Sequence, residues 1–281
     1  MKKIFAVILT CVLAAASVAM LASCAKGNDT ITVVSREEGS GTRGAFVELM
    51  GIMQDDKDMT YEKAEISNST SVVISTVQGN ANAIGYISLG SLDDSVKAVK
   101  VDGVEPTVAN IKSGTYQVSR PFIIATQDEI SDLAADFIRF ILSKEGQAIV
   151  SEKYISIDEA APSYTASGLS GKITLAGSTS VSPLMDELAD AYKALNAGVT
   201  IEIQQSGSGA GIQSAIEGVC DIGMSSRELK DTEIAAGLTP TTIALDGVAV
   251  IVNKQNTVDA LTSEQIKSIY TGATASWSAV K

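Results

Sequence analysis

The chain of 281 residues contains no histidine, and this absence removes the commonest general base and the commonest metal ligand of proteins. Lysine and arginine are also scarce: 21 of them stand against 33 aspartates and glutamates, which gives a formal net charge of −12. Nucleic-acid binding needs a basic stripe that neutralises phosphates, so the composition argues against a nucleic-acid partner. The sequence shows no clustered carboxylates and no nucleophile–base pair, so we expect no metal, no cofactor and no catalytic activity.

Cysteine is nearly absent from the body of the chain, because Cys11 and Cys24 lie near the N-terminus and only Cys220 lies elsewhere. Residues 1–23 combine two lysines with a long apolar run, which ends in small residues and is followed by a polar stretch. This pattern predicts a signal peptide, although the run is also long enough for a transmembrane helix. Cys220 has apolar neighbours, so we expect a small core residue and no disulfide.

The end of this leader, Leu21-Ala22-Ser23-Cys24, resembles a bacterial lipobox. The resemblance implies cleavage before Cys24 and lipidation of its thiol, with an ordinary secretory signal or an uncleaved anchor as alternatives. We expect residues 24–30 to form a lipidated N-terminal tether. The folded part would then lie on the extracytoplasmic face of the cell membrane, held by more than one acyl chain.

Strand and helix patterns alternate along the rest of the chain, which predicts an α/β fold with a parallel or mixed sheet and helices on both faces. Residues 54–68 are polar and are expected to form a loop or a short helix, and residues 96–114 a hairpin-like region. The segment 158–171 is small and polar without apolar periodicity, which makes it the best linker. Expected strands cover residues 31–36, 83–89, 120–126, 172–177, 199–205, 221–226 and 242–253. Expected helices cover residues 44–53, 69–78, 131–150, 183–195, 211–219 and 261–272.

Three segments share one chemistry: each runs from a strand, through glycine and serine or threonine, into an amphipathic helix. They read SREEGSGTRGAF (35–46), LAGSTSVSPL (175–184) and QQSGSGAGIQ (204–213). A helix start offers unpaired N–H groups and a partial positive charge, and hydroxyls add short donors. Together they can bind an oxyanion without net positive charge.

Ordinary helix capping explains any one of these segments on its own. Three in one chain, one of them with an arginine, favour anion binding instead. The planar fork of Arg36 matches two oxygens of an oxyanion, although a surface pair with Glu37 or Glu38 is the alternative. Arg43 and Arg227 are expected to be surface or lobe–lobe residues.

These segments, together with DIGMSSREL, DGVAVIVN and LTSEQIKSIYTG, resemble the phosphate-binding lipoproteins of high-affinity phosphate ABC importers, which are PstS-like type II periplasmic binding proteins. The resemblance covers nearly all of the mature chain. In that family, however, the GSTS segment lies near the N-terminus and the REEGSGTR segment follows the IYTG helix. Here REEGSGTR comes first, so the order looks circularly permuted, and residues 158–171 would bridge the old termini.

The family fold implies two α/β lobes with a ligand cleft between them. Crossings near residues 117–120 and 246–248 would divide the chain into two parts. Residues 28–117 plus 247–281 would form a discontinuous lobe A. Residues 118–246, with the linker 158–171, would form a continuous lobe B. Joining Lys281 to Asn28 would restore the usual order.

The phosphate-binding set that the resemblance implies is drawn from both lobes. Some family members carry an aspartate at the position of Ser226, where it accepts a proton from phosphate and so rejects sulfate. Serine can donate or accept, and Asp246 is either a substitute acceptor or a structural acid at the lobe boundary. The expected site residues are Thr179, Ser180, Ser208 and Ser226 from lobe B, and Arg36, Ser40, Gly41 and Thr42 from lobe A.

The resemblance thus implies a monomeric solute-binding protein that captures inorganic phosphate and delivers it to the membrane permease of an ABC importer. Two alternatives stay open. A hydrolase of phosphate esters is disfavoured by the missing histidines. A phosphate sensor or surface-attachment protein would keep the fold and lose binding.

Overall fold

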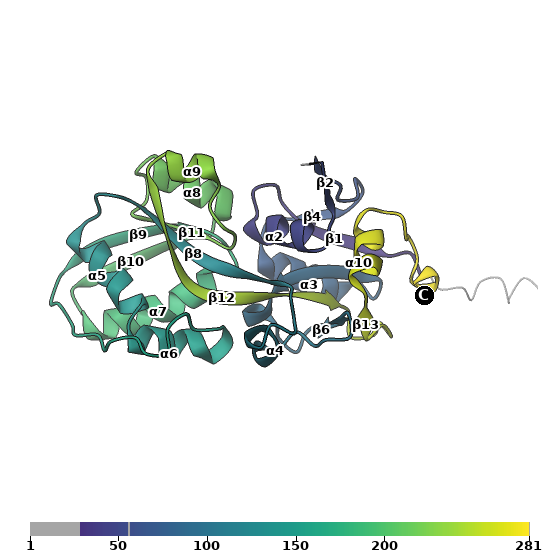
Figure 1. Ribbon diagram of the computed structural model, residues 1–281, viewed down its shortest axis with the longest axis horizontal. Coiled ribbons are helices and arrows are strands. Elements are labelled where there is room, and N and C mark those ends of the chain that lie inside the picture. The colour runs from purple at the N-terminus through teal and green to yellow at the C-terminus, as the bar shows by residue number, and fades with distance from the viewer. Residues whose placement is uncertain (1–28, 56, 281) are drawn as a thin grey trace, which may run out of the picture.

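A computed structural model describes residues 29–55 and 57–280. Figure 1 shows two lobes side by side, with β8 and β12 running between them. One lobe carries β1–β7, α2–α4, β13 and α10, and the other carries β8–β11 and α5–α9. We call these lobe A and lobe B. The predicted signal peptide, Cys24 and the start of the tether lie outside the described residues.

Short strands and helices alternate in both lobes, as their sequence patterns predict. In lobe A and its continuation the elements are β1 (Thr32–Arg36), α2 (Gly41–Leu49), β2 (Met53–Gln54), β3 (Lys57–Asp58), β4 (Glu65–Ser67), α3 (Thr70–Gly79), β5 (Ala83–Ser88), η1 (Leu89–Ser91), β6 (Lys97–Ala98), β7 (Lys100–Val101), α4 (Val108–Lys112), β13 (Ala260–Leu261), α10 (Ser263–Tyr270) and η2 (Trp277–Ala279). In lobe B they are β8 (Ser119–Gln127), α5 (Asp132–Ile141), α6 (Lys144–Lys153), β9 (Gly171–Gly177), α7 (Ser182–Leu195), β10 (Val199–Gln204), α8 (Ser208–Ile216), β11 (Ile222–Ser225) and α9 (Asp231–Ala235). The strand β12 (Leu238–Val252) runs through both lobes.

One mixed sheet of nine strands passes through both lobes, in the order β10-β9-β11-β8-β12-β5-β1-β4, with β6 paired to β12. The 15-residue strand β12 joins the two halves. Its residues up to Gly247 pair antiparallel with β8, and Val248–Val252 pair antiparallel with β5. The division into lobes at residues 117/118 and 246/247 stays a prediction, and this change of strand partner supports it.

Each lobe has its own apolar core, because the amphipathic helices turn their apolar faces onto the sheet. In lobe B the core packs α5, α6 and α7 against β8 and β9. In lobe A, Phe46 of α2 stacks on Tyr86 of β5 with ring centroids 3.9 Å apart, and Tyr270 of α10 meets Phe46 edge-on. Cys220 is buried in a smaller cluster of lobe B beside Ile212 and Leu238, as expected.

Several expected elements differ in extent. Residues 131–150 form two helices instead of one, because Ser143 caps α6 by accepting a hydrogen bond from the N–H of Gly146. A side chain at Gly146 would collide with the carbonyl of Phe140, so glycine permits the break. Residues 54–68 contain three short strands, and α4 lies within the expected hairpin region. Met53, the last residue of the expected helix 44–53, is exposed in β2.

The two ends of the described chain pair with one another. Thr30 forms a β-bridge with Ser276, and the N–H of Trp277 donates to the carbonyl of Asp29 at 2.9 Å. Lys281 and Asn28 themselves lie outside the described residues. Among the residues that the structure does describe, no helix is long and apolar enough to cross a membrane.

The predicted linker 158–171 has no helix, and its only strand residue is Gly171 at the start of β9. Hydrogen bonds nevertheless hold it against lobe B. The buried carboxylate of Asp136 accepts hydrogen bonds from Tyr164 and Ser167 of the linker and from Tyr192 of α7, each at 2.7 Å. The linker is therefore an ordered strap across α5 and α7.

Candidate anion-binding site

The first of the three Gly-Ser/Thr turns connects β1 to α2 in lobe A. Gly39 takes a φ of 83°, a conformation that favours glycine. Ser40 is the N-cap of α2, and its hydroxyl accepts a hydrogen bond from the N–H of Arg43 at 3.3 Å. This turn presents the side chains of Arg36 and Thr42, both buried, toward lobe B.

The second turn connects β9 to α7 in lobe B. The hydroxyl of Ser178 accepts hydrogen bonds from the N–H groups of Ser180 and Val181, at 3.2 and 3.4 Å. Ser178 also donates to the hydroxyl of Ser226 at 3.0 Å. This local network leaves the side chains of Thr179 and Ser180 to face lobe A.

The third turn leads from β10 into α8, and it is built on close backbone approach. Gly207 precedes the helix with a φ of 86°. A side chain at Gly211 would lie 2.2 Å from the Cα of Gly177, so α8 can pack here only as glycine on glycine. The hydroxyl of Ser208 accepts the N–H of Ser226 at 3.2 Å and lies 3.4 Å from the Ser226 hydroxyl.

Side chains from the two lobes meet where these turns converge. Nη2 of Arg36 donates to Oγ1 of Thr179 at 3.1 Å, and the hydroxyls of Thr42 and Ser180 lie 2.9 Å apart. The N–H of Gly209 in lobe B also donates to the carbonyl of Gly39 in lobe A at 2.9 Å. We call the place where these contacts join the lobes the junction. The structure therefore brings predicted site residues of both lobes into direct contact.

Gly41 lies at the tightest point of this contact. A Cβ atom added there would stand 2.6 Å from the hydroxyl oxygen of Ser208 and 2.7 Å from that of Ser226. Gly41 is the first residue of α2, so its N–H is one of the unpaired donors of a helix start. All eight predicted residues thus lie at one junction, although Ser40 acts there as a helix cap.

Sequence reasoning missed Thr70, which begins α3 and is buried in the same junction. Its hydroxyl lies 3.1 Å from that of Ser180 and 3.4 Å from that of Thr179, and it accepts a hydrogen bond from Nη1 of Arg36 at 3.5 Å. The signal was present as SNSTSVV at 67–73, a fourth polar helix start. The sequence predicts a helix over residues 69–78, and ordinary capping already explains its polar start.

Arg36 carries the one formal positive charge among these contacts. Its guanidinium is bound in a bidentate manner by Glu37, with both N–O distances 2.8 Å. The alternative interpretation is a surface arginine paired with Glu37 or Glu38. The pair with Glu37 is present, but the Arg36 side chain is only 3% exposed and therefore does not lie at the surface. Because Glu37 balances much of this charge, the hydroxyls and N–H groups supply most of the remaining donors for an anion.

The other arginines considered have partners in their own lobes. Arg43 binds Asp58 at 2.8 Å and donates to the carbonyl of Arg36 at 2.9 Å. Arg227 forms a bidentate pair with Glu233 on α9. Asp246 is paired with Arg120 at 3.2 Å, which places its carboxylate at the crossing of the lobes.

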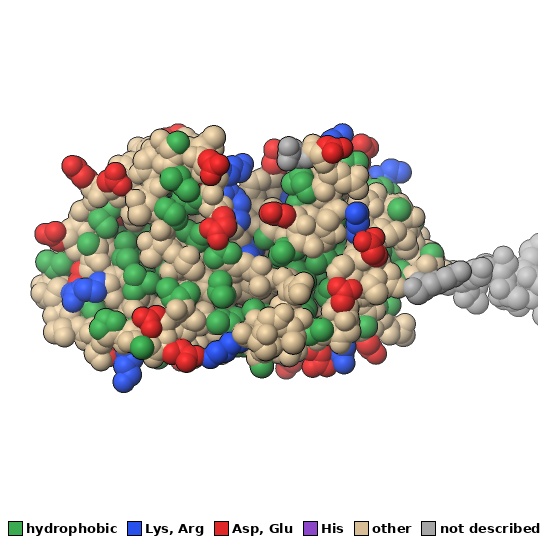
Figure 2. Space-filling model, in the orientation of Figure 1, with side chains coloured by type: hydrophobic (Ala, Val, Ile, Leu, Met, Phe, Trp, Pro, Cys, Tyr) green, Lys and Arg blue, Asp and Glu red, His purple; other side chains and the backbone are tan. Residues whose placement is uncertain are grey.

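A hollow of about 400 Å³ opens directly beside the junction. The two lobes also leave a notch between them on the face drawn in Figure 2, and lysine or arginine atoms lie on its wall, whereas the residues that line the hollow include none. Hydroxyls dominate the lining of the hollow, and no charged side chain belongs to it. Its lining residues are Ser69, Thr70, Ser71, Ile74, Ser91, Thr179, Pro183 and Gln205.

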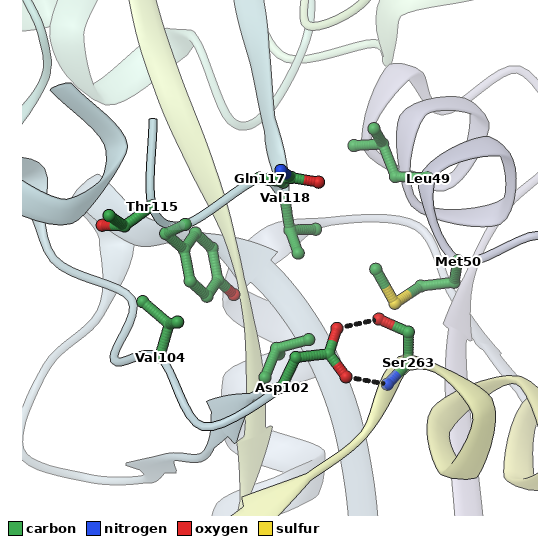
Figure 3. A pocket seen from close by; sticks show the side chains of 10 residues that line it. Leu49, Met50, Asp102, Val104, Thr115, Gln117, Val118 and Ser263 are labelled. Carbon is green, nitrogen blue, oxygen red and sulfur yellow. Dashed lines mark hydrogen bonds between the residues drawn. The ribbon is translucent and has the colours of Figure 1, made fainter. Parts of the chain in front are cut away.

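A second hollow of about 400 Å³ lies within lobe A and has a different chemistry (Figure 3). Leu49, Met50 and Val118 form its apolar wall, and Asp102 supplies a carboxylate that accepts hydrogen bonds from Ser263. A carboxylate repels an anion, so this hollow does not extend the junction described above.

The described residues offer little for other chemistry. Among residues 29–55 and 57–280, no three histidine, cysteine, aspartate or glutamate side chains are grouped to hold a metal ion. Burial raises the pKa of the Cys220 thiol, which disfavours the reactive thiolate. The hydroxyl and N–H donors that both lobes bring to the junction are suited to binding a small anion.

Comparison with known proteins identifies the family of this chain. Residues 19–145 and 162–280 match the PBP superfamily domain. The chain is 50% identical over 273 residues to "Phosphate-binding protein PstS 2" of Streptococcus agalactiae serotype V, covering 93% of each chain. The crystal structure of a phosphate-binding protein of a phosphate ABC transporter from Streptococcus pneumoniae is 48% identical, with a TM-score of 0.72 over 90% of this chain and 100% of that one.

Another relative matches over a much shorter stretch. "Phosphate-binding protein PstS" of Pseudomonas aeruginosa is 37% identical over 123 residues, which are 41% of this chain and 38% of that protein. The streptococcal relative therefore shares the order of segments along nearly the whole chain, and the Pseudomonas protein aligns in order with less than half of it.

Proposed function

This chain belongs to the PstS-like phosphate-binding proteins of phosphate ABC transporters, and we propose that the junction of its two lobes is the phosphate site. The observation that carries the proposal is the pair of contacts across the cleft, Arg36 with Thr179 and Thr42 with Ser180. A ligand held by both partners of these contacts has differential affinity for the closed form, which is what closure requires.

Phosphate would be bound by local dipoles and hydroxyls, although the chain is strongly acidic as a whole. The starts of α2, α3, α7 and α8 meet at the junction, and helix starts favour anions. Arg36 adds a positive charge, although its Nε and Nη2 already donate to Glu37. The proposed ligand-binding residues are Arg36, Ser40, Gly41, Thr42, Thr70, Thr179, Ser180, Ser208 and Ser226.

The protein would act as a monomeric, extracytoplasmic capture protein that delivers phosphate to the ABC permease without changing it chemically. Cleavage before Cys24 and its lipidation would tether the protein to the cell membrane. Mass spectrometry of the protein extracted from membranes tests this tether, and an unmodified Cys24 thiol would exclude it.

We also infer that the chain order is permuted relative to that of the Pseudomonas aeruginosa relative. Three observations support this inference: the paired ends at Asp29–Thr30 and Ser276–Trp277, the ordered strap 158–171, and the match that stops after 123 residues. The streptococcal relative matches over 93% of its own length, so this order is shared and is not peculiar to this chain.

Calorimetric titration with phosphate, sulfate and molybdate tests the binding function. We expect phosphate to bind, and Arg36→Met to weaken it about a hundredfold, because hydrogen bonds to charged groups contribute about 1.5–3 kcal/mol each. Lys172→Met removes an equal charge on the exposed side of β9 and should leave affinity unchanged. Absence of heat with every anion would favour the sensor or attachment alternative, and turnover of a chromogenic phosphate ester would favour a hydrolase.

A further inference from the structure

A buried ion pair lies at the crossing between the lobes, outside the contacts that bind the proposed ligand. Arg120 of β8 and Asp246 of β12 face each other in the strand register, and Nη2 of Arg120 lies 3.2 Å from Oδ2 of Asp246. Their side chains are 2% and 1% exposed. Burying two charges costs free energy of desolvation, so a buried ion pair contributes little to the stability of the fold by itself. The position of this pair indicates a role other than stabilisation.

Arg120 also contacts the backbone of the proposed phosphate site. Its Nη1 donates to the backbone carbonyl of Ser226 at 3.1 Å, and the hydroxyl of the same residue meets Ser178 and Ser208 inside the site. The Arg120 guanidinium therefore binds the backbone of a residue whose hydroxyl belongs to the proposed phosphate site. From there it both orients the turn that carries Ser226 and places a positive charge close to the ligand.

Asp246 lies on the opposite side of Arg120, where it also meets lobe A. Its Oδ1 accepts a hydrogen bond from the N–H of Gly90 at 3.5 Å. Within the described part of the chain, the buried Nε of Arg120 has no hydrogen-bond partner. Arg120 thus has one of its donors unused, and the pair is enclosed by both lobes.

Burial strengthens the electrostatic effect of Arg120 and Asp246 on groups that lie several ångströms away. In a low-dielectric interior, charges interact over several ångströms far more strongly than in water. Burial lowers the pKa of Arg120, and the positive charge of Arg36 lowers it further, whereas Asp246 raises it. An anion bound at Ser226 would interact with the charge of Arg120 in the same way, through the low-dielectric interior.

We propose that Arg120 and Asp246 set the electrostatic potential of the phosphate site: Arg120 is a positioning residue that strengthens anion binding through Ser226, and Asp246 attenuates this effect. The inference rests on the proposed site. It makes the two members of one ion pair act on affinity with opposite signs, whereas a pair that only stabilises the fold would act with the same sign.

Calorimetric titration of phosphate into Arg120→Met, Asp246→Asn and the double variant tests this. We expect Arg120→Met to weaken binding about tenfold or more, and Asp246→Asn to tighten it about threefold, since a unit charge several ångströms from the anion shifts affinity by such factors. The double variant should fall between these two. Arg120→Lys keeps the charge and should recover most of the affinity that Arg120→Met loses.

Lys172→Met and Glu202→Gln are charge-matched controls, because they remove the same charges from the exposed pair that joins β9 and β10. Both should bind phosphate as the unchanged protein does. Thermal denaturation identifies any variant that fails to fold, and Asp246→Asn and Arg120→Lys then still decide. Weaker binding by folded Asp246→Asn, or by Arg120→Lys as much as by Arg120→Met, overturns the proposal. If the unchanged protein does not bind phosphate, the proposed function itself fails.

Discussion

Replacing Gly41 by alanine should act as a steric wedge between the lobes. The added methyl group would lie 2.6 Å from the hydroxyl oxygen of Ser208, 2.7 Å from that of Ser226 and 3.0 Å from the carbonyl carbon of Ser226. The two hydroxyls can rotate, but the carbonyl carbon belongs to the backbone. The lobes would have to stay apart by several tenths of an ångström at the point where both must touch the ligand.

The cost can be worked out from the contacts that closure makes. If the wedge lengthens one hydrogen bond to the charged ligand beyond useful range, the loss is about 1.5–3 kcal/mol, or about ten- to a hundredfold in affinity. Within lobe A the change is harmless or favourable, because alanine in a helix is more stable than glycine by about 0.5–1 kcal/mol. Gly41→Ala should therefore lower the affinity for phosphate without lowering the stability of the fold.

Calorimetric titration with phosphate, together with thermal denaturation of the free protein, measures both quantities. Gly79→Ala is the matched control, since Gly79 also lies in a helix and a Cβ there meets nothing within 4 Å. We expect the control to bind normally. Phosphate binding by Gly41→Ala within about threefold of the unchanged protein would refute the closed-junction site.

Three further predictions concern single side chains. Thr70→Val removes a hydroxyl 3.1 Å from that of Ser180 and should weaken phosphate binding about tenfold by calorimetry; an unchanged affinity would exclude Thr70 from the site. Ser226→Asp should confine binding to protonated phosphate, so that affinity falls as pH rises from 6 to 8 and sulfate binding is lost; a flat profile would contradict this. Burial alone would raise the pKa of Asp136, but hydrogen bonds from Tyr192, Tyr164 and Ser167 outweigh it and lower the pKa to about 2. Because the folded-state pKa is lowered, the stabilisation is present above about pH 4 and is lost as pH falls toward 2; Asp136→Asn should cost about 2 kcal/mol in urea unfolding at pH 7 and flatten the acid limb of the stability profile.

Much of the fold could be predicted because local patterns and tertiary packing agree. A capping box of Thr262 and Gln265 starts α10 inside the expected helix 261–272, and Leu133 and Phe137 face the core from α5 inside the expected helix 131–150. The break at Ser143 was missed because apolar periodicity continues across it, and only the crowding at Gly146 reveals it. The short strands β2, β3 and β4 carry too few residues for a recognisable alternation.

The site could be predicted as a set of turns, but the sequence alone did not specify their contacts. Pairing between Arg36 and Thr179 joins residues 143 positions apart, and such a contact depends on the closure of two lobes. Thr70 was missed because a single polar helix start is equally well explained by capping. Arg120 gave no signal, since nothing local distinguishes a buried arginine from an exposed one in a strand.

The long strand β12 has a consequence for how the molecule melts. Ile243 and Ala244 pack in the core of lobe B, whereas Val248, Val250 and Val252 pack in that of lobe A. Unfolding of either core would therefore disrupt β12, which also contributes residues to the other core. The two lobes should therefore denature as one cooperative unit with a single calorimetric transition.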